Sequence, residues 1–138
     1  CSAATNTGYR SAATNTGDYS AATNTGDCSA ATNTGYCSAA TNTGYRSAAT
    51  NTGYCSAATN TGDYSAAKVE GKESIAIVTG KDSKACGALG CWLILTERSE
   101  WDGETYPIKE VKAVKVDGET IKSNVYYQLV NGEIKEVE

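Results

Sequence analysis

The sequence contains no histidine, phenylalanine or methionine, and no leucine, isoleucine or valine precedes Val69. The absence of imidazole excludes a Ser-His-Asp triad, a histidine general base and histidine metal ligands, which removes the chemistry of many enzyme classes. The absence of methionine excludes a Met-rich binding surface. Because large aliphatic residues are missing from the first half of the chain, that half does not build a conventional apolar core.

Clustered positive charge and long apolar runs are also missing. The 138 residues have a net charge of −4, whereas a nucleic-acid groove needs clustered Lys and Arg to neutralise phosphates. We therefore expect no nucleic-acid partner. There is no run of about eighteen apolar residues and no basic leader followed by an apolar stretch, so we expect neither membrane insertion nor a targeting segment.

The cysteines do not have the dense spacing of small disulfide-stapled domains, so we expect free thiols. The last two lie five residues apart, with no histidine and no second pair nearby, so we expect no zinc site. The six cysteines are Cys1, Cys28, Cys37, Cys55, Cys86 and Cys91.

A tandem repeat dominates the first two thirds of the sequence. The heptapeptide Ser-Ala-Ala-Thr-Asn-Thr-Gly occurs seven times at a spacing of nine residues, and two variable residues complete each unit. Degenerate copies begin at Ser65, Ser74 and Ser83, so ten units run from Ser2 to Cys91. The identical copies begin at Ser2, Ser11, Ser20, Ser29, Ser38, Ser47 and Ser56. A fixed short period of this kind indicates a repeat architecture.

A period of nine residues is too short for a helical repeat and suits one short strand plus one tight turn. We expect the glycine at unit position seven to take a positive φ at the corner. Two units per coil give an eighteen-residue coil with two facing sheets, while three units give a triangular coil. We favour two, because the interior residues are too small to fill a triangle. Residues 1–91 are therefore predicted to form an all-β, parallel β-solenoid.

Strand alternation predicts which side chains point inward. Lys68, Glu70 and Lys84 occupy even unit positions, which should face water, so Ser, Ala and Asn at odd positions should form the interior. The inverted orientation stays open because Ile75 and Ile77 are also at even positions, where we expect the C-terminal segment to cover them. The asparagines are expected to stack as an amide ladder. They are Asn6, Asn15, Asn24, Asn33, Asn42, Asn51 and Asn60.

After Cys91 the composition changes to large apolar and charged residues with a period of two, as in Ile108–Val116, which indicates half-buried strands. Pro107 marks a strand start or edge. Residues 92–138 are therefore predicted to form a small antiparallel β-meander of three to five strands that caps the last coil. Its hairpin turns are expected at Asp102-Gly103, Asp117-Gly118 and Asn131-Gly132.

The unit Ser74-Ile-Ala-Ile-Val-Thr-Gly80 and the following Ser83-Lys-Ala resemble repeats in the heads of trimeric autotransporter adhesins, which are left-handed parallel β-rolls. The segment from Ser83 to Glu138, with its Gly-Ala-Leu-Gly-Cys-Trp and Val-Asp-Gly-Glu-Thr-Ile-Lys motifs, is similar to a small C-terminal domain on uncharacterised repeat proteins of gut bacteria and their phages. The resemblance implies a β-solenoid with a dedicated cap on a phage or cell surface, or outside the cell. It implies no catalytic residue and no cofactor.

The threonines at unit positions four and six fall on one face of each strand. Stacked coils would arrange them as a flat grid with spacings of roughly 6.6 Å and 4.7 Å. Such a grid resembles the ice-binding faces of insect β-solenoid antifreeze proteins. The alternative is that Thr favours strands without any ligand. The array consists of Thr5, Thr7, Thr14, Thr16, Thr23, Thr25, Thr32, Thr34, Thr41, Thr43, Thr50, Thr52, Thr59 and Thr61.

The variable turn positions carry tyrosines and aspartates. The tyrosines either form an aromatic strip for carbohydrate or partner binding, or stack only on one another. Asp18, Asp27 and Asp63 are reminiscent of calcium-binding nonapeptides, but only three of the seven identical units have an aspartate, so we expect no metal site. The tyrosines are Tyr9, Tyr19, Tyr36, Tyr45, Tyr54 and Tyr64.

No group of residues forms a catalytic constellation. The sequence therefore predicts a non-enzymatic structural protein without a cofactor: a rigid rod or a filament subunit. Because the chain begins in mid-repeat, we expect an open strand edge at the first coil and end-to-end association with copies of itself. The alternative function is a binding module, either ice-binding through Thr or adhesive through Tyr.

Overall fold

The computed structural model describes residues 3–10 and 12–137, and within these ranges it contains fourteen β-strands and no helix. The predicted all-β class is confirmed. Ten short strands come from the ten repeat units: β1 (Ala3–Asn6), β2 (Ala12–Asn15), β3 (Ala21–Asn24), β4 (Ala30–Asn33), β5 (Ala39–Asn42), β6 (Ala48–Asn51), β7 (Ala57–Asn60), β8 (Ala66–Val69), β9 (Ile75–Val78) and β10 (Lys84–Cys86). Four strands follow: β11 (Trp92–Arg98), β12 (Ile108–Lys115), β13 (Tyr126–Val130) and β14 (Glu133–Val137).

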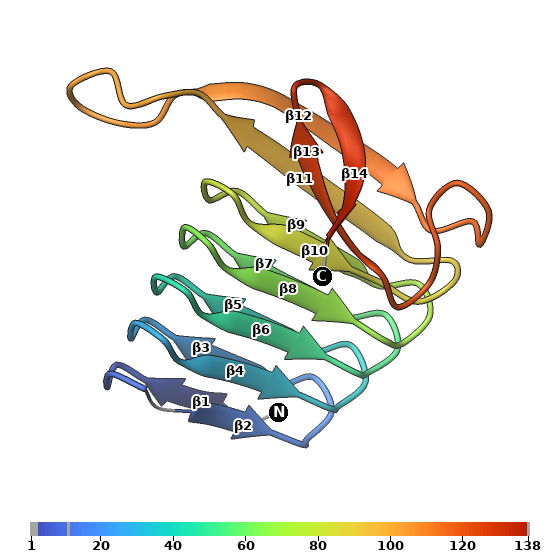
Figure 1. Ribbon diagram of the computed structural model, residues 1–138. Coiled ribbons are helices and arrows are strands. Elements are labelled where there is room, and N and C mark those ends of the chain that lie inside the picture. Colours follow the sequence, from blue (N-terminus) through green and yellow to red (C-terminus); the bar gives the residue numbers. More distant parts are fainter. Residues whose placement is uncertain (1–2, 11, 138) are drawn as a thin grey trace.

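The strands alternate between two seven-stranded sheets, so two units make one coil (Figure 1). Sheet A has the order β1-β3-β5-β7-β9-β11-β12, and sheet B the order β14-β13-β10-β8-β6-β4-β2. Repeat strands pair in parallel and in register with the strand two units on, as in Ala3↔Ala21 and Ala12↔Ala30. The predicted β-solenoid with two nonapeptides per coil is confirmed.

The interior between the two sheets is filled by small side chains. Ala40, Asn42 and their equivalents in neighbouring coils are 0% exposed, and Ser47 is 3% exposed. The threonines are half-buried or exposed. Ser, Ala and Asn therefore point inward and Thr points outward, and the inverted orientation is excluded.

The repeat glycines do not take the positive φ that the sequence suggested. That conformation belongs to unit position nine, where Tyr19, Cys37 and their equivalents have φ between 51° and 59°. The glycine is needed for close approach instead: a Cβ on Gly44 would lie 2.0 Å from the carbonyl oxygen of Gly26 in the preceding coil. Position seven therefore excludes every side chain because consecutive coils touch there through their backbones.

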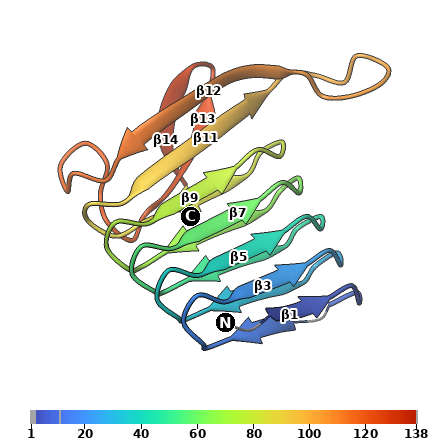
Figure 2. The same ribbon diagram turned by 180° about the vertical axis from the view of Figure 1, so that it is seen from behind.

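The C-terminal strands extend both sheets by antiparallel pairing. β12 pairs with β11 at the end of sheet A, and β13 pairs with β10 at the end of sheet B and carries β14 at its outer edge. The antiparallel segment is therefore two hairpins, one on each sheet, rather than one continuous meander (Figures 1 and 2). The reason is that each of the two sheets ends in a free strand edge of its own.

β11 repeats the inward pattern of the array, although the sequence assigns it to the cap. It pairs in parallel with β9, with Trp92 opposite Ile75, so Cys91 takes the place of the unit serine. Leu93 and Leu95 occupy the inward positions of Ala and Asn and are 0% exposed. The unit that starts at Ser83 is one residue shorter than the others. The eleventh strand is therefore out of phase with the nine-residue period and was not recognised from the sequence.

Large apolar side chains appear only as the array meets the cap. Leu93 and Leu95 join a buried cluster that continues the alanine column of the solenoid. The other large members of this cluster are Val69, Val78, Val116, Ile121, Tyr127 and Leu129. The cap thus supplies the apolar burial that the repeat units lack.

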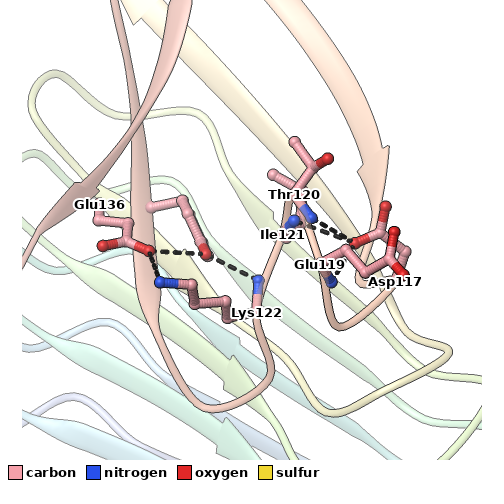
Figure 3. Close-up of polar contacts among 7 residues, drawn as sticks. Asp117, Glu119, Thr120, Ile121, Lys122 and Glu136 are labelled. Carbon is pink, nitrogen blue, oxygen red and sulfur yellow. Dashed lines mark hydrogen bonds and ion pairs between the residues drawn. The ribbon is translucent and has the colours of Figure 1, made fainter.

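Two of the predicted turns serve different purposes. Asn131 and Gly132, with φ of 52° and 78°, form the hairpin turn between β13 and β14 as predicted. Asp117-Gly118 does not form a hairpin, because the strands that it follows and precedes belong to different sheets. Instead, Oδ1 of Asp117 accepts hydrogen bonds from the backbone N–H groups of the three residues Glu119 to Ile121 (Figure 3).

The third predicted turn, Asp102-Gly103, and the predicted strand start at Pro107 lie in one loop. Asp102-Gly103 belongs to the loop between β11 and β12, where the N–H of Asp102 donates to the carbonyl of Thr105. Pro107 directly precedes β12, and its carbonyl accepts from the N–H of Ser99.

The C-terminal segment does not cover Ile75 and Ile77, contrary to expectation. Ile75 is 38% exposed beside Trp92, which is 45% exposed, and Ile77 is half-buried. The physical reason is that the C-terminal strands add to the sheet edges instead of folding over the outer face of sheet A (Figure 2).

The glycine column gives a test of the coil spacing. The substitution Gly44→Ala should lower the free energy of unfolding by about 3 kcal/mol, because a methyl group must displace the backbone of the neighbouring coil. The adjacent exposed Thr43 provides the control, since Thr43→Ala should change stability by less than about 0.5 kcal/mol. Urea unfolding followed by circular dichroism measures both. Equal stability of the two variants would show that the coils are not in backbone contact at Gly44.

Candidate functional surfaces

The interior serines form two hydrogen-bonded columns, one for the odd-numbered and one for the even-numbered units. The N–H of Ser29 donates to Oγ of Ser47 in the next coil at 3.0 Å, and Oγ of Ser47 donates to the carbonyl of Gly26 at 3.1 Å. The same pair of bonds recurs along the array. Each serine therefore joins its own coil to the preceding one, close to the glycine contact.

The interior asparagines bind backbone groups rather than one another. Nδ2 of Asn51 donates to the carbonyls of Ser38 and Ala57 at 2.8 Å and 3.0 Å, and Oδ1 accepts from the N–H of Gly53. Both amide hydrogens are used in this way in Asn33, Asn42, Asn51 and Asn60. These four asparagines do not form the amide ladder that the sequence suggested. Each one, at the end of a strand of one sheet, donates to backbone carbonyls at the beginning of strands of the other sheet.

The threonine array is divided between two opposite faces. The part on sheet A consists of Thr5, Thr7, Thr23, Thr25, Thr41, Thr43, Thr59 and Thr61. The part on sheet B consists of Thr14, Thr16, Thr32, Thr34, Thr50 and Thr52. In-register pairing such as Thr23↔Thr41 stacks the hydroxyl-bearing residues in straight columns on each face.

The two outer faces differ in charge near the cap. On sheet A the outward positions of β9 and of the start of β11 hold Ile75, Ile77 and Trp92, so the face stays uncharged from β1 to the first residues of β11. On sheet B, Lys68 at an outward position of β8 forms an ion pair at 3.0 Å with Glu70, which directly follows that strand. Hydrogen bonding to Glu70 raises the pKa of Lys68 above its ordinary value. Only sheet A therefore offers a long uncharged surface within the described residues.

The turn tyrosines lie on both edges of the solenoid. On one edge the ring centroids of Tyr19 and Tyr36 are 6.1 Å apart, and those of Tyr36 and Tyr54 are stacked at 5.5 Å. On the other edge Tyr45 and Tyr64 are in edge contact at 5.6 Å. The structure thus shows three contacting rings on one edge and a contacting pair on the other instead of one strip, and all six turn tyrosines are exposed.

The turn aspartates accept hydrogen bonds from the next coil. Oδ1 of Asp18 accepts from the N–H of Tyr36 at 3.0 Å, and Oδ1 of Asp63 accepts from the N–H of Lys81 at 2.8 Å. Asp27 accepts from the equivalent position of its next coil. The part of the chain that the structure describes contains no group of three or more side chains arranged to hold a metal ion.

The cysteines occupy different environments, and Cys1 lies outside the described residues. Cys28 and Cys55 are exposed at turns, whereas Cys86 and Cys91 are buried. Burial raises the pKa of the Cys86 thiol. Sγ of Cys91 donates to the carbonyl of Gly71 at 2.9 Å, as the unit serines donate to theirs.

A cavity of about 50 Å³ lies between the cap hairpins, and Glu97 on its wall holds them together. The Glu97 carboxylate, on β11, accepts hydrogen bonds from the N–H groups of Asn131 and Gly132, in the turn of the other hairpin. Arg98, also on the wall, donates through Nε to the carbonyl of Thr79 at 2.7 Å. The Glu97, Arg98 and Gln128 side chains on this wall bind backbone atoms of the protein, which favours a structural use of the cavity.

The Glu97 contact should make the cap sensitive to acid. Burial alone would raise the pKa of Glu97, but the two backbone N–H groups and Lys109 lower it below its ordinary value. A lowered folded-state pKa means that the stabilisation is present above the unfolded-state pKa and is lost as the pH falls through the folded-state pKa. The protection factors for hydrogen exchange at Asn131 and Gly132, which correct for the slower intrinsic exchange in acid, should therefore fall as the pH is lowered.

The variant Glu97→Gln should show low protection factors at Asn131 and Gly132 already at neutral pH, with little further fall in acid. The exposed Glu100 is the control, because Glu100→Gln should keep the wild-type pH profile. A wild-type profile in Glu97→Gln would contradict the role given to this carboxylate.

The described part of the chain contains no helix long and apolar enough to cross a membrane. No family model matches the chain, and no match was found among curated proteins or solved structures.

Proposed function

We propose that the chain is a non-enzymatic structural protein, a rigid β-solenoid rod that serves as a spacer or fibre segment on a phage or cell surface. The observation that carries this proposal is that successive coils make the same hydrogen bonds to their neighbours. Ser29, Ser38 and Ser47 each donate to the glycine carbonyl twenty-one residues earlier, and the asparagines repeat their two carbonyl contacts in the same way. Coils of this kind are interchangeable segments of length.

Rigidity follows from where these bonds lie. The backbone ladders run along the rod axis, while the asparagine amides cross between the sheets near the turns. Bending the rod would stretch the ladder on one sheet and compress the other, and shearing the sheets would break the amide bonds. Interchangeable coils also support end-to-end association, because a coil of a second copy presents the same backbone groups as a coil of the same chain.

Adding coils should lengthen the rod in proportion. Each added pair of units, eighteen residues, is one coil and should lengthen the rod by roughly 4.7–4.9 Å. A variant with four added coils should therefore be close to 20 Å longer than the wild-type chain. Small-angle scattering measures the maximum dimension, and negative-stain electron microscopy over a range of concentrations detects end-to-end filaments. An insertion of the same composition in scrambled order is the control and should not extend the rod. A rod that keeps its length when units are added would overturn the proposal.

A second candidate function is a binding module, and the uncharged outer face of sheet A favours it. That face carries a straight column of threonines that continues into Ile77 and Ile94, beside an alanine column that continues into Ile75 and Trp92. Such a surface is suited to ordered water or to another flat apolar surface. The contacting tyrosine rings on the two edges offer a second, adhesive surface. Either use is compatible with a rod that holds the surface in place.

The two faces of the solenoid give a matched test of ice binding. The set Thr25→Lys, Thr43→Lys and Thr61→Lys alters sheet A, and the set Thr16→Lys, Thr34→Lys and Thr52→Lys alters sheet B. If sheet A binds ice, the first set should abolish thermal hysteresis and the second should retain most of it. Neither set should shorten the rod, because position six points away from the interior. Absence of thermal hysteresis in the wild-type chain would refute the ice-binding function.

A further inference from the structure

Two turn cysteines that are distant in sequence lie side by side in the structure. Cys37 and Cys55 are eighteen residues apart, which is one full coil, and both occupy unit position nine on the same edge of the solenoid. The N–H of Cys37 donates to the carbonyl of Tyr54 at 2.9 Å, which joins the two turns directly. Cys55 therefore sits immediately above Cys37 in the next coil.

The local geometry suits a covalent link between them. Neighbouring parallel strands are about 4.8 Å apart, and disulfides join residues whose Cα atoms are roughly 4.4–6.8 Å apart. The two residues have nearly the same backbone conformation, with φ of 51° and 56°, so their side chains leave the chain in similar directions. Cys55 is exposed and Cys37 half-buried, so a small reagent reaches the pair.

The two thiols share one electrostatic environment. Both of them raise the pKa of the neighbouring Tyr36 hydroxyl. Partial desolvation raises the pKa of Cys55, and the neighbouring Cys37 raises it further. The two sulfur atoms therefore belong to one chemical site.

We propose that Cys37 and Cys55 are a dithiol–disulfide site that crosslinks two consecutive coils of the solenoid in the presence of a small disulfide such as oxidised glutathione. One cysteine thiolate attacks a sulfur of oxidised glutathione, releases one glutathione thiolate and forms a mixed disulfide. The second cysteine thiolate then attacks the protein sulfur of the mixed disulfide and releases the other glutathione. The two cysteines are oxidised, and one oxidised glutathione becomes two reduced molecules.

The other described cysteines are placed differently. Cys28 also occupies position nine and is exposed, but it lies on the opposite edge, where the same position of the adjacent coils holds Arg10 and Arg46. Cys86 and Cys91 are buried. Among the described residues, the crosslink can therefore form at one place, between two consecutive coils in the middle of the identical repeats. It closes the chain segment from Cys37 to Cys55 into a loop.

The experiment uses the full chain with Cys1→Ser and Cys28→Ser as the parent, treated with oxidised glutathione in the native state at low protein concentration. Its intact mass should fall by two hydrogen atoms without glutathione adducts. Trypsin cleaves after Arg46, so peptides 11–46 and 47–68 should stay joined until a reductant is added. The thermal midpoint of the oxidised protein should exceed that of the reduced protein by roughly 10 °C.

Two further variants test the geometry. Adding Cys37→Ser to the parent should leave a glutathione adduct on Cys55 and no rise in the thermal midpoint. Inserting one nine-residue unit between Arg46 and Ser47 should move the two cysteines to opposite edges and prevent the link, although the coil is preserved. The proposal is overturned if the parent accepts separate glutathione adducts on both cysteines, if the link forms only between chains or only in denaturant, or if the one-unit insertion leaves the link intact.

Discussion

The fold depends on pairing the buried polar side chains of a narrow interior with the backbone. Among the described residues, Oδ1 of Asn33 is the one buried side-chain nitrogen or oxygen atom without a hydrogen-bond partner. A core of serine, alanine and asparagine buries little apolar surface, so the hydrophobic effect contributes less per residue than in an ordinary domain. An unpaired amide or hydroxyl in this space would cost about 1–3 kcal/mol, and the repeat would multiply that cost. The contacts of Asn51 with two carbonyls and one N–H remove this cost three times in its unit. Asn42 and Asn60 make the same three contacts. A backbone-to-side-chain network, rather than apolar packing, sets the spacing of the coils.

Identical units have a second problem, which the cap solves. Seven copies with the same contacts define no unique register, because a shift by a whole coil preserves nearly all of them. Leu93, Leu95 and Tyr127 are fully buried and have no counterpart among the identical repeats. Their cluster fixes the position of the last coil against the cap. Each earlier coil then pairs with the coil that follows it, so the whole array takes a single register. Apolar burial at one end thus provides the specificity that the polar interior lacks.

The sequence was sufficient for the features that follow from periodicity. The solenoid, the two units per coil and the all-β class come from the spacing of nine and the absence of large aliphatic residues. The sequence was insufficient where one residue type can serve two different structural purposes. Glycine serves a positive φ and a close backbone approach equally well, and only the stacked coils show that Gly44 serves the second. Cys91 was missed as an interior residue because one deleted residue displaced it from the period. The proximity of Cys37 and Cys55 could have been predicted from the sequence, because they are eighteen residues apart and two nine-residue units make one coil.

The alternation of units between two sheets gives the repeat number a parity. The variable residues at positions eight and nine lie on one edge in odd units and on the opposite edge in even units. Slippage of a replicating gene that removes or adds one copy of the identical unit leaves the interior unchanged, yet it transfers every upstream tyrosine, aspartate and cysteine to the other edge relative to the cap. A change of two copies keeps all of them in place. A genetic event that is silent for folding therefore rewrites the surface pattern of the rod in a single step.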